Sequence, residues 1–203
     1  MEYLVTMTTR VPAGTSELVV DEVRAREVQR AAELAGSGYL LRLWRPPLRS
    51  GEWRSLGLFS APDEVQLEQV LASMPLRIWR SDAVLPLSPH PNDPASMGAG
   101  STQRVGSEFL ITMTVVVPHE TSQQRLQEVL ALEAERAREL ATQGHLRRLW
   151  LLPAEPGRQR ALGLWHAGNG NEITAIVDAL PLRPWMEVEI TPLTPHPSDP
   201  AGH

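Results

Sequence analysis

The sequence predicts an α+β protein made of two ferredoxin-like (βαββαβ) modules, and three observations lead to this fold class. The first is an internal repeat: LVTMTTRVP at position 4 returns as LITMTVVVP at position 110, an offset of 106, and the other repeated segments keep this offset without a gap. The second is the hydrophobic period, which switches between about 2 and 3.6 in the order strand, helix, strand, strand, helix, strand. The third is a stretch rich in Gly, Ser, Pro and Ala between the copies, which is typical of a flexible tether. We therefore expect module 1 at residues 1–91, a flexible linker at 92–107 and module 2 at 108–203.

The first half of module 1 carries clear start and stop signals. Residues 3–11 alternate Tyr, Val and Met with Thr, which predicts a strand. Thr15 or Ser16 is a suitable N-cap for the long helix that follows, and Gly36 and Gly38 end it. The sequence therefore opens with a strand and a long helix.

The second half of module 1 predicts two strands, a shorter helix and a final strand. Residues 39–45 and 54–60 read as strands on either side of a loop rich in Pro, Gly and Arg. We expect a helix at Asp63–Met74, which Pro75 ends. We expect the last strand at residues 78–87, followed by a His-Pro tail outside the module. Module 2 repeats these signals at the same spacing.

A βαββαβ module leaves one face of its sheet without helices of its own. Burying that face against a second copy removes apolar surface from water, and a tandem fusion supplies the second copy covalently. We therefore expect the chain to form a pseudo-dimer with facing antiparallel sheets.

The composition narrows the classes of partner. The chain has no cysteine, which excludes disulfides, thiolate nucleophiles and cysteine metal sites. Its formal net charge of −5 argues against nucleic acid as a partner. No apolar run approaches the roughly 18 residues of a membrane span, and the first ten residues do not resemble a signal peptide. We expect a cytoplasmic protein that acts on a small molecule, with no nucleic-acid or membrane partner.

No cofactor motif is evident in the sequence. The histidines lack the spacing of metal ligands, whether with one another or with carboxylates. A phosphate-binding loop, a Rossmann glycine fingerprint and a nucleophile elbow are likewise missing from the sequence. We therefore expect neither a metal nor an organic cofactor.

The most informative residue is a glutamate on the apolar face of the first helix. Steps of three and four residues place Glu27 near the centre of an apolar stripe, and Glu133 holds the same position in module 2. The stripe of module 1 is otherwise formed by Val20, Val23, Ala31 and Leu34. An ionised carboxylate is costly to bury, so such a group is either paired or has a raised pKa. A carboxylate tuned in this way is a good proton shuttle near neutral pH, which makes Glu27 and Glu133 the catalytic candidates.

A structural role is an equal alternative for the two glutamates. Each carboxylate can form an ion pair with a basic residue, such as Arg42 or Arg148, and only stabilise the fold. The duplication does not separate the two interpretations, because it copies structure and function alike.

Further candidates for substrate binding recur at equivalent positions of the two modules. Histidines in a PHP context follow each last strand, arginines near the strands can grip a carboxylate in bidentate fashion, and tryptophans on or beside the strands can form a pocket wall. Surface or packing roles are the alternative for all of them. The candidates are Arg42, Trp44, Trp79 and His90 in module 1, and Arg148, Trp150, Trp185 and His196 in module 2.

The order of these motifs resembles the muconolactone isomerase family. The resemblance rests on the LxMT opening strand, the glutamate-rich first helix, the LW strand and the closing PL…HP, and it spans essentially all of each module. It implies a ferredoxin-like module that forms pockets where modules pair, in oligomers built from dimers. It also implies a cofactor-free proton shift that isomerises a lactone, with the proton carrier at Glu27 and Glu133 and the closing histidine at His90 and His196.

The sequence departs from the family pattern around the proton carrier. Val28 and Ala134 stand where the family has a lysine, and Arg42 and Arg148 stand where it has a histidine. The tyrosine and asparagine that the family carries before the third strand are also absent. These departures favour a larger and more apolar substrate than muconolactone.

Three functions follow as hypotheses. The first is a cofactor-independent isomerase or cyclase in which a glutamate moves a proton next to the carbonyl of a lactone or polyketide-like compound, for example in natural-product biosynthesis. The second is a non-catalytic pseudo-dimer that binds an apolar small molecule, and the third is a cofactor-free monooxygenase. For the assembly, we expect a homo-oligomer of pseudo-dimers.

Overall fold

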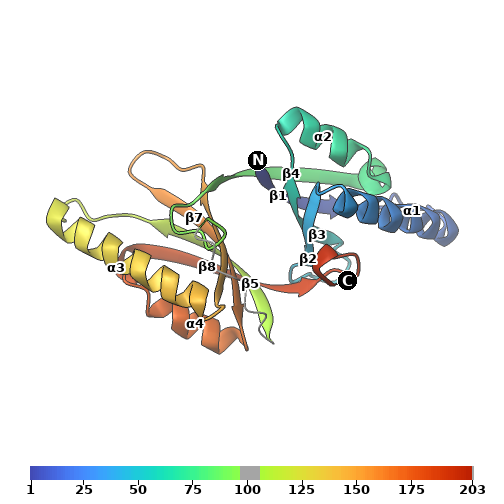
Figure 1. Ribbon diagram of the computed structural model, residues 1–203. Helices are drawn as coiled ribbons and strands as arrows, with labels where there is room; N and C mark the ends of the chain where they lie inside the picture. Colours follow the sequence, from blue (N-terminus) through green and yellow to red (C-terminus); the bar gives the residue numbers. More distant parts are fainter. Residues whose placement is uncertain (97–105, 203) are drawn as a thin grey trace. The chain divides into compact units, whose positions relative to one another are not determined.

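The computed structural model describes residues 1–96 and 106–202 and consists of two compact units. Unit 1 combines Met1–Leu87 with Thr194–His203, and unit 2 comprises Ser88–Leu193. Each unit holds the main body of one module, and Figure 1 shows its helices and its sheet. The predicted α+β class, with two ferredoxin-like modules, is confirmed.

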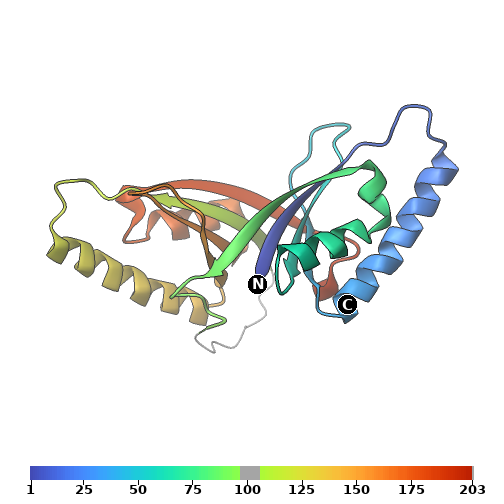
Figure 2. The ribbon, with the colours of Figure 1, turned by 90° about the horizontal axis from the view of Figure 1, so that it is seen from above.

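Unit 1 has the predicted order of elements. Its four long strands form an antiparallel sheet in the order β4-β1-β3-β2, in which Val5 of the central strand β1 lies opposite Gly57 on one side and Val84 on the other. Helices α1 and α2 lie on one face of this sheet (Figure 2). The elements are β1 (Glu2–Thr9), α1 (Glu17–Gly36), β2 (Leu40–Arg45), β3 (Arg54–Ser60), α2 (Glu64–Ala72), the 3-10 helix η1 (Pro75–Trp79) and β4 (Arg80–Pro89).

Unit 2 repeats this arrangement, with the strand order β8-β5-β7-β6. Its elements are β5 (Ser107–Val115), α3 (Gln123–Thr142), β6 (Leu146–Leu152), β7 (Gln159–Ala167), α4 (Gly170–Asp178), the 3-10 helix η2 (Arg183–Trp185) and β8 (Met186–Pro195). After β8 the chain ends in a short 3-10 helix, η3 (Pro200–Gly202), which belongs to unit 1.

The helix signals in the sequence correspond to real caps. The Ser16 side chain accepts a hydrogen bond from the backbone N–H of Val19, so the second of the two predicted caps is the one used. Gly38, just past the end of α1, has a φ of +76°, a conformation that favours glycine. The last strand begins at Arg80 instead of residue 78, because Pro75–Trp79 forms a 3-10 helix ahead of it.

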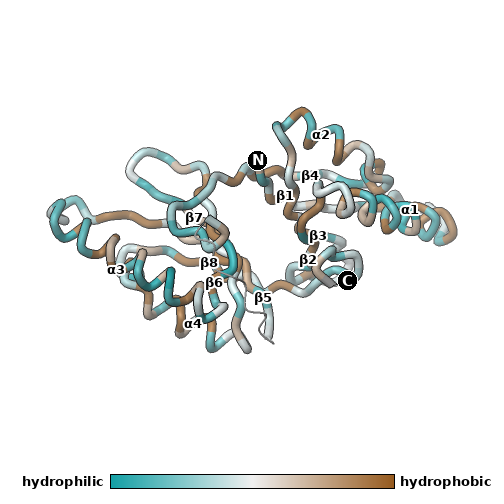
Figure 3. Tube along the Cα trace, in the orientation of Figure 1, coloured by the Kyte–Doolittle hydropathy of each residue, from teal (hydrophilic) through white to brown (hydrophobic). Residues whose placement is uncertain are grey.

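The core of each unit lies between its sheet and its helices. In unit 1, Tyr3, Val5, Leu34, Phe59 and Leu71 are almost fully buried. In unit 2, the same layer is built around Ile111, Leu140, Trp165 and Ile173. Figure 3 shows hydrophobic stretches along β1 and β3 and mixed hydrophobic and hydrophilic turns on α1, as expected for a helix with one buried side.

The ends of the last strands, together with the segments that follow them, are exchanged between the modules. The end of β4 pairs with β6 in unit 2, where Pro89 lies opposite Trp150, and the end of β8 pairs with β2 in unit 1, where Pro195 lies opposite Trp44. We call residues 88–96 and 194–202 the exchanged tails. Each tail comes from one module and packs in the unit that contains the body of the other.

The predicted linker begins inside one of these tails. Residues 97–105 lie outside the described part of the chain, whereas Asp93, near the start of the predicted linker, is buried in unit 2 with an exposed fraction of 3%. Among the described residues, no helix has the length and apolar character that crossing a membrane requires.

Candidate functional site

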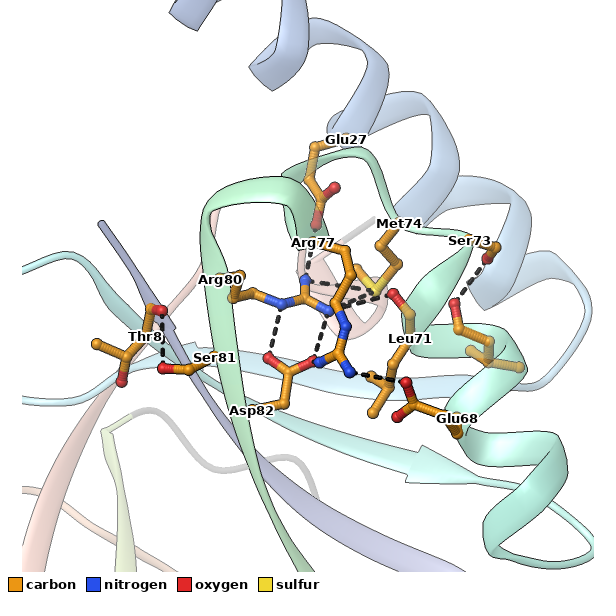
Figure 4. A network of polar contacts seen from close by, with 11 residues as sticks. Thr8, Glu27, Glu68, Leu71, Ser73, Met74, Arg77, Arg80, Ser81 and Asp82 are labelled. Atoms are coloured by element: carbon orange, nitrogen blue, oxygen red, sulfur yellow. Dashed lines mark hydrogen bonds and ion pairs between the residues drawn. The ribbon is translucent and has the colours of Figure 1, made fainter. Parts of the chain in front are cut away.

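Glu27 is held at both carboxylate oxygens on the inner side of α1. Its Oε2 accepts a hydrogen bond from the backbone N–H of Leu76 at 2.8 Å, and its Oε1 accepts one from Nη1 of Arg80 at 3.1 Å. Its side chain is 14% exposed. Figure 4 shows Glu27 reaching from α1 toward Arg80, with Asp82 on the other side of the guanidinium. The position at the centre of the apolar stripe thus places the carboxylate against the start of β4.

The Arg80 guanidinium binds two carboxylates, those of Glu27 and Asp82. Its side chain is 2% exposed and donates to both oxygens of Asp82, at 2.7 and 3.0 Å, in addition to Glu27. Arg77 also binds Asp82, and the Arg77 side chain is 31% exposed (Figure 4). A buried guanidinium between two carboxylates satisfies the charges that burial would otherwise leave unpaired. The alternative partner considered from sequence, Arg42, is not the residue that pairs with Glu27.

Burial governs the pKa of Glu27. Removal from water raises the pKa of this carboxyl above its ordinary value, and nearby Asp82 also raises it, whereas the Leu76 N–H and Arg80 lower it. The net direction is upward. The carboxylate therefore accepts a proton more readily than an exposed glutamate does, as a general base for carbon acids requires.

A pocket of about 440 Å³ opens beside Glu27 within unit 1. Residues of β1, α1, β2 and β3 line it, and the tail 194–202 completes it. The lining includes Arg24 and Glu27 from α1, Arg45 from β2, Arg80 from β4 and His196 from the tail. The volume lies within the range of about 300–1,000 Å³ that is typical of small-molecule sites.

The tail fixes His196 at this pocket. The backbone N–H of His196 donates to the carbonyl of Leu43 at 3.0 Å, and the ring Nδ1 accepts from the backbone N–H of Ser198 at 3.1 Å. Burial and the adjacent Arg45 guanidinium lower the pKa of His196 to about 4, against a raising effect of Asp199. The imidazole is therefore neutral near pH 7, and its proton lies on Nε2 because Nδ1 is an acceptor.

Asp199 anchors the tail to β2. This carboxylate is 2% exposed and accepts from the backbone N–H of Leu43 at 3.0 Å and from Nε and Nη2 of Arg42 at 3.1 and 3.0 Å. The Arg42 guanidinium also lies 4.7 Å from the centre of the Trp44 ring. Arg42 and Trp44 therefore hold the tail and lie outside the pocket lining.

Glu133 occupies the equivalent place in unit 2 with fewer partners. Its Oε2 accepts from the backbone N–H of Leu182 at 2.9 Å, and in the described ranges it forms no ion pair. Met186 and Val188 stand at the positions that Arg80 and Asp82 hold in unit 1. Burial raises the pKa of Glu133, and only the Leu182 hydrogen bond lowers it.

The pocket beside Glu133 is small. Its volume is about 100 Å³, and its lining is mostly apolar, with Met113, Leu130 and Leu151 among the residues. His90 and Asn92 of the tail 88–96 complete it, and the His90 Nδ1 accepts from the backbone N–H of Asn92 at 3.0 Å. Burial lowers the pKa of His90, which outweighs the opposite effect of Asp93.

The second tail is anchored like the first. Oδ1 of Asp93 accepts from the backbone N–H of Leu149 at 3.0 Å, and Nε of Arg148 contacts both carboxylate oxygens at 3.3 Å. The Arg148 guanidinium lies 4.8 Å from the centre of the Trp150 ring. Each unit therefore holds its tail with an equivalent clamp.

The predicted site residues thus fall into three groups. Glu27 and His196 line one pocket, and Glu133 and His90 line the other, so each pocket combines a helix glutamate with a tail histidine from the other module. Arg42, Trp44, Arg148 and Trp150 form the clamps that hold the tails. Trp79 and Trp185 are half-buried in η1 and η2 and do not line either pocket.

Several pocket residues were not predicted as site residues from the sequence. Arg45 and Arg80 line the unit 1 pocket, and so does Trp53, whose ring lies 4.5 Å from the Arg24 guanidinium. Their signal is that the second module does not repeat them: Leu151, Met186 and Gln159 stand at the equivalent positions. Within residues 1–96 and 106–202, no group of three or more His, Cys, Asp or Glu residues is placed to hold a metal ion.

Comparison with known proteins gives the same repeat structure. The family model of muconolactone delta-isomerase matches residues 1–93 and again residues 107–199. The muconolactone delta-isomerase of Cupriavidus pinatubonensis is 28% identical over 90 residues, which cover 44% of this chain and 95% of the relative. The muconolactone delta-isomerase of Rhodococcus opacus is 30% identical over 91 residues, 45% of this chain and 95% of the relative. Each relative therefore corresponds in length to about one module.

Solved structures share the fold over nearly the whole chain. A heme-binding protein from Thermus thermophilus superimposes with a TM-score of 0.59 at 12% identity, covering 98% of this chain and 93% of that one. A mutant chlorite dismutase from Candidatus Nitrospira defluvii gives a TM-score of 0.60 at 12% identity, with coverage of 96% and 92%. At this identity the similarity is one of fold alone.

Proposed function

Because the chain belongs to the muconolactone delta-isomerase family, we propose that it is a cofactor-independent isomerase that moves a proton within a lactone or a related carbonyl compound. The observation that carries the proposal is the placement of a desolvated carboxylate at the wall of a pocket in each unit, Glu27 in unit 1 and Glu133 in unit 2. In both, burial raises the pKa of the carboxyl, which suits a group that accepts and returns a proton.

The proposed step is an intramolecular proton shift. The carboxylate of Glu27 removes a proton from the carbon next to the carbonyl, and the electron pair of that C–H bond moves into the enolate. The protonated Glu27, whose carboxyl proton can exchange with solvent water, then gives a proton to the far carbon of the conjugated system and returns to its ionised form. Atoms and electrons balance, and no oxidant or reductant is consumed.

The pocket also supplies a group for the enolate oxygen. The neutral His196 ring, with its proton on Nε2, gives the unit 1 pocket an N–H donor that does not neutralise the Glu27 carboxylate. His90 has the same arrangement in unit 2. A developing negative charge is stabilised best by donors that are fixed before the reaction, and the exchanged tails fix both rings.

The volumes favour unit 1 as the place where a substrate binds. A pocket of about 440 Å³ accommodates a small lactone, whereas one of about 100 Å³ is below the usual range for a ligand site. We extend the proposal to the finer expectations from the sequence. These are ring closure instead of isomerisation, a polyketide-like substrate, a biosynthetic role, a cytoplasmic location and a homo-oligomer.

The test is turnover by matched glutamine variants. Wild type, Glu27→Gln, Glu133→Gln and the double variant are incubated with muconolactone and with a panel of substituted butenolides, and double-bond migration is followed by proton NMR. We expect the double variant to lose turnover while its circular dichroism stays unchanged. A double variant with wild-type turnover would rule out the glutamate mechanism, and turnover that requires oxygen would point to a monooxygenase.

A second candidate function is binding without catalysis. The observation in its favour is the ion pair between Glu27 and Arg80, because a paired carboxylate can serve packing alone. In that case wild type binds butenolides without converting any of them, and Glu27→Gln changes only their affinity.

A further inference from the structure

The ion pair of Glu27 is the inner end of a longer charge network in unit 1. Arg80 joins Glu27 to Asp82. Arg77 in turn joins Asp82 to Glu68, so that carboxylates and guanidiniums alternate from α1 to α2 (Figure 4). Three carboxylates therefore share two cations. Asp82 is the central acid of this network, and its side chain is 2% exposed, so water screens its charge only weakly.

Asp82 binds Arg80 more extensively than Glu27 does. It accepts two hydrogen bonds, from Nε at 2.7 Å and from Nη2 at 3.0 Å, whereas Glu27 accepts one from Nη1 at 3.1 Å. Two parallel hydrogen bonds fix the plane of the guanidinium and so direct its third nitrogen at Glu27. Arg80 and Asp82 are two positions apart on β4 and therefore project from the same face of the sheet. The strand itself thus sets the direction of the cation that Glu27 meets.

Module 2 has no counterpart of this pair. Met186 and Val188 stand at the positions of Arg80 and Asp82. The helix glutamate is nevertheless present in unit 2 and still accepts a backbone hydrogen bond, at 2.9 Å. The arginine and the aspartate are therefore not needed to dock the glutamate against the fold. What they add in unit 1 is a pair of charges beside it.

The charge of Asp82 opposes the ionisation of Glu27 in two ways. It repels the Glu27 carboxylate directly, and it balances part of the Arg80 charge that favours the ionised form. Burial is the largest cause of the raised pKa of Glu27, and Asp82 raises it further, whereas the Leu76 N–H and Arg80 lower it. The other charged or titratable side chains of the pocket form no hydrogen bond or ion pair with Glu27 in the described part of the chain; they are Arg24, Arg45 and His196.

We propose that Asp82 is a positioning residue for the unit 1 site, which fixes the Arg80 guanidinium and balances its charge so that Glu27 remains an effective base. Arg80 then holds the carboxylate in one orientation without forming a fully neutralised ion pair with it. Asp82 acts through Arg80, because it does not line the pocket itself. The inference rests on the proposed function of Glu27 as the proton carrier.

The test is a titration of both helix glutamates that needs no turnover. The full chain is labelled with 13C at the glutamate side-chain carboxyl carbon, and the two resonances are assigned with Glu27→Gln and Glu133→Gln. One variant is Asp82→Asn, which removes the charge and keeps the shape of the side chain. The other is Arg80→Met/Asp82→Val, which installs the residues of module 2. Glu133 is an internal reference in each sample.

The matched control is Asp178→Asn in unit 2. Asp178 forms an exposed ion pair with Arg183 at 2.8 Å, and Arg183 is the counterpart of Arg77. The substitution therefore makes the same chemical change next to the equivalent arginine, outside the charge network of unit 1. We expect the pKa of both helix glutamates to stay at the wild-type value in this control.

The two test variants should shift the pKa of Glu27 in opposite directions. In Asp82→Asn the Arg80 charge acts on Glu27 alone, so the pKa should fall, while that of Glu133 stays unchanged. In the double variant the pKa should rise above that of wild type, because Arg80 has the larger effect of the two charges. A loosened structure cannot give this pattern, since admitting water lowers the raised pKa in both variants. Amide exchange of Leu76, whose N–H binds Glu27, should stay as slow in Asp82→Asn as in wild type.

The pH profile of turnover gives a second readout, with any compound of the butenolide panel that wild type converts. In Asp82→Asn the acid limb of kcat/KM should shift to lower pH, and the plateau should fall because a weaker base removes a proton more slowly. An unchanged or higher Glu27 pKa in Asp82→Asn, a lower one in the double variant, or faster Leu76 exchange in Asp82→Asn would overturn the inference. The titration does not depend on catalysis, so failure of the proposed function, which the glutamine variants test, is distinguished from failure of this inference.

Discussion

The clamp of the tail 194–202 gives a prediction whose size follows from the structure. Asp199 is buried and accepts two hydrogen bonds from the Arg42 guanidinium, at 3.1 and 3.0 Å, and one from the backbone N–H of Leu43 at 3.0 Å. In Asp199→Asn the amide can still accept from Leu43, but the charge that binds Arg42 is lost. Two charge-assisted hydrogen bonds contribute about 1.5 kcal/mol each at the low end. Because Arg42 is 20% exposed, water replaces part of this, so we expect the tail to dock about 2–3 kcal/mol less tightly.

Native-state amide exchange measures this loss directly. The His196 N–H is bonded to the Leu43 carbonyl only while the tail is docked. A loss of 2–3 kcal/mol corresponds to roughly 30- to 150-fold faster exchange of the tail amides. Asp93→Asn is the matched control, because it removes the same clamp from unit 2. We expect each variant to speed exchange in its own tail and leave the other tail unchanged. If Asp199→Asn changes exchange of residues 194–202 by less than about threefold, the clamp does not hold the tail and the reasoning fails.

Four further predictions concern pH and packing. The pKa of Glu133 is raised in the folded state, so the folded state binds this proton more tightly than the unfolded chain does, and the contribution of Glu133 to stability is lost as pH rises through that pKa. In urea unfolding, Glu133→Gln should therefore be more stable than wild type at about pH 7 but not at about pH 4. The lowered pKa of His196, about 4, predicts stability that falls as pH drops from about 6.5 toward 4, and His196→Gln should reduce this dependence; an imidazole midpoint near 6.5 by NMR would contradict it. Phe59→Ala empties a fully buried site and should lower the free energy of unfolding by about 3–5 kcal/mol, whereas Ile78→Ala at a 69% exposed position should change it little. Gly57→Ala brings a Cβ to 2.4 Å from the Phe59 ring, so a loss of about 1–3 kcal/mol is expected, and an unchanged midpoint in urea would show that the ring moves freely.

The secondary structure of each module was predictable because its signals are local. The N-cap of α1, the glycine after it and the apolar stripe all lie within about five turns of one helix, where spacing alone fixes which side faces the core. The same spacing placed Glu27 on the inner side of the helix. The start of the last strand was misplaced by two residues, since the 3-10 helix at Pro75–Trp79 has no signal apart from its proline.

The partners of the site residues were less predictable, because they depend on contacts distant in sequence. The Arg42–Asp199 pair spans 157 positions, and no local pattern indicates that the tail returns to β2 of the other module. For this reason Arg42 was considered as a partner of Glu27, while Arg80, which does bind Glu27, was not. The departures from the family pattern favoured an apolar substrate, whereas the folded unit 1 pocket brings three arginines together from α1, β2 and β4.

Proton transfer by the helix glutamates is the central claim, and isotope exchange tests it most directly. Muconolactone and the butenolide panel are incubated in D2O with wild type and with Glu27→Gln/Glu133→Gln, and deuterium at the carbon next to the carbonyl is measured by NMR. We expect deuterium incorporation by wild type in at least one of these compounds and none above the enzyme-free rate in the double variant. Equal incorporation by both proteins would contradict the claim.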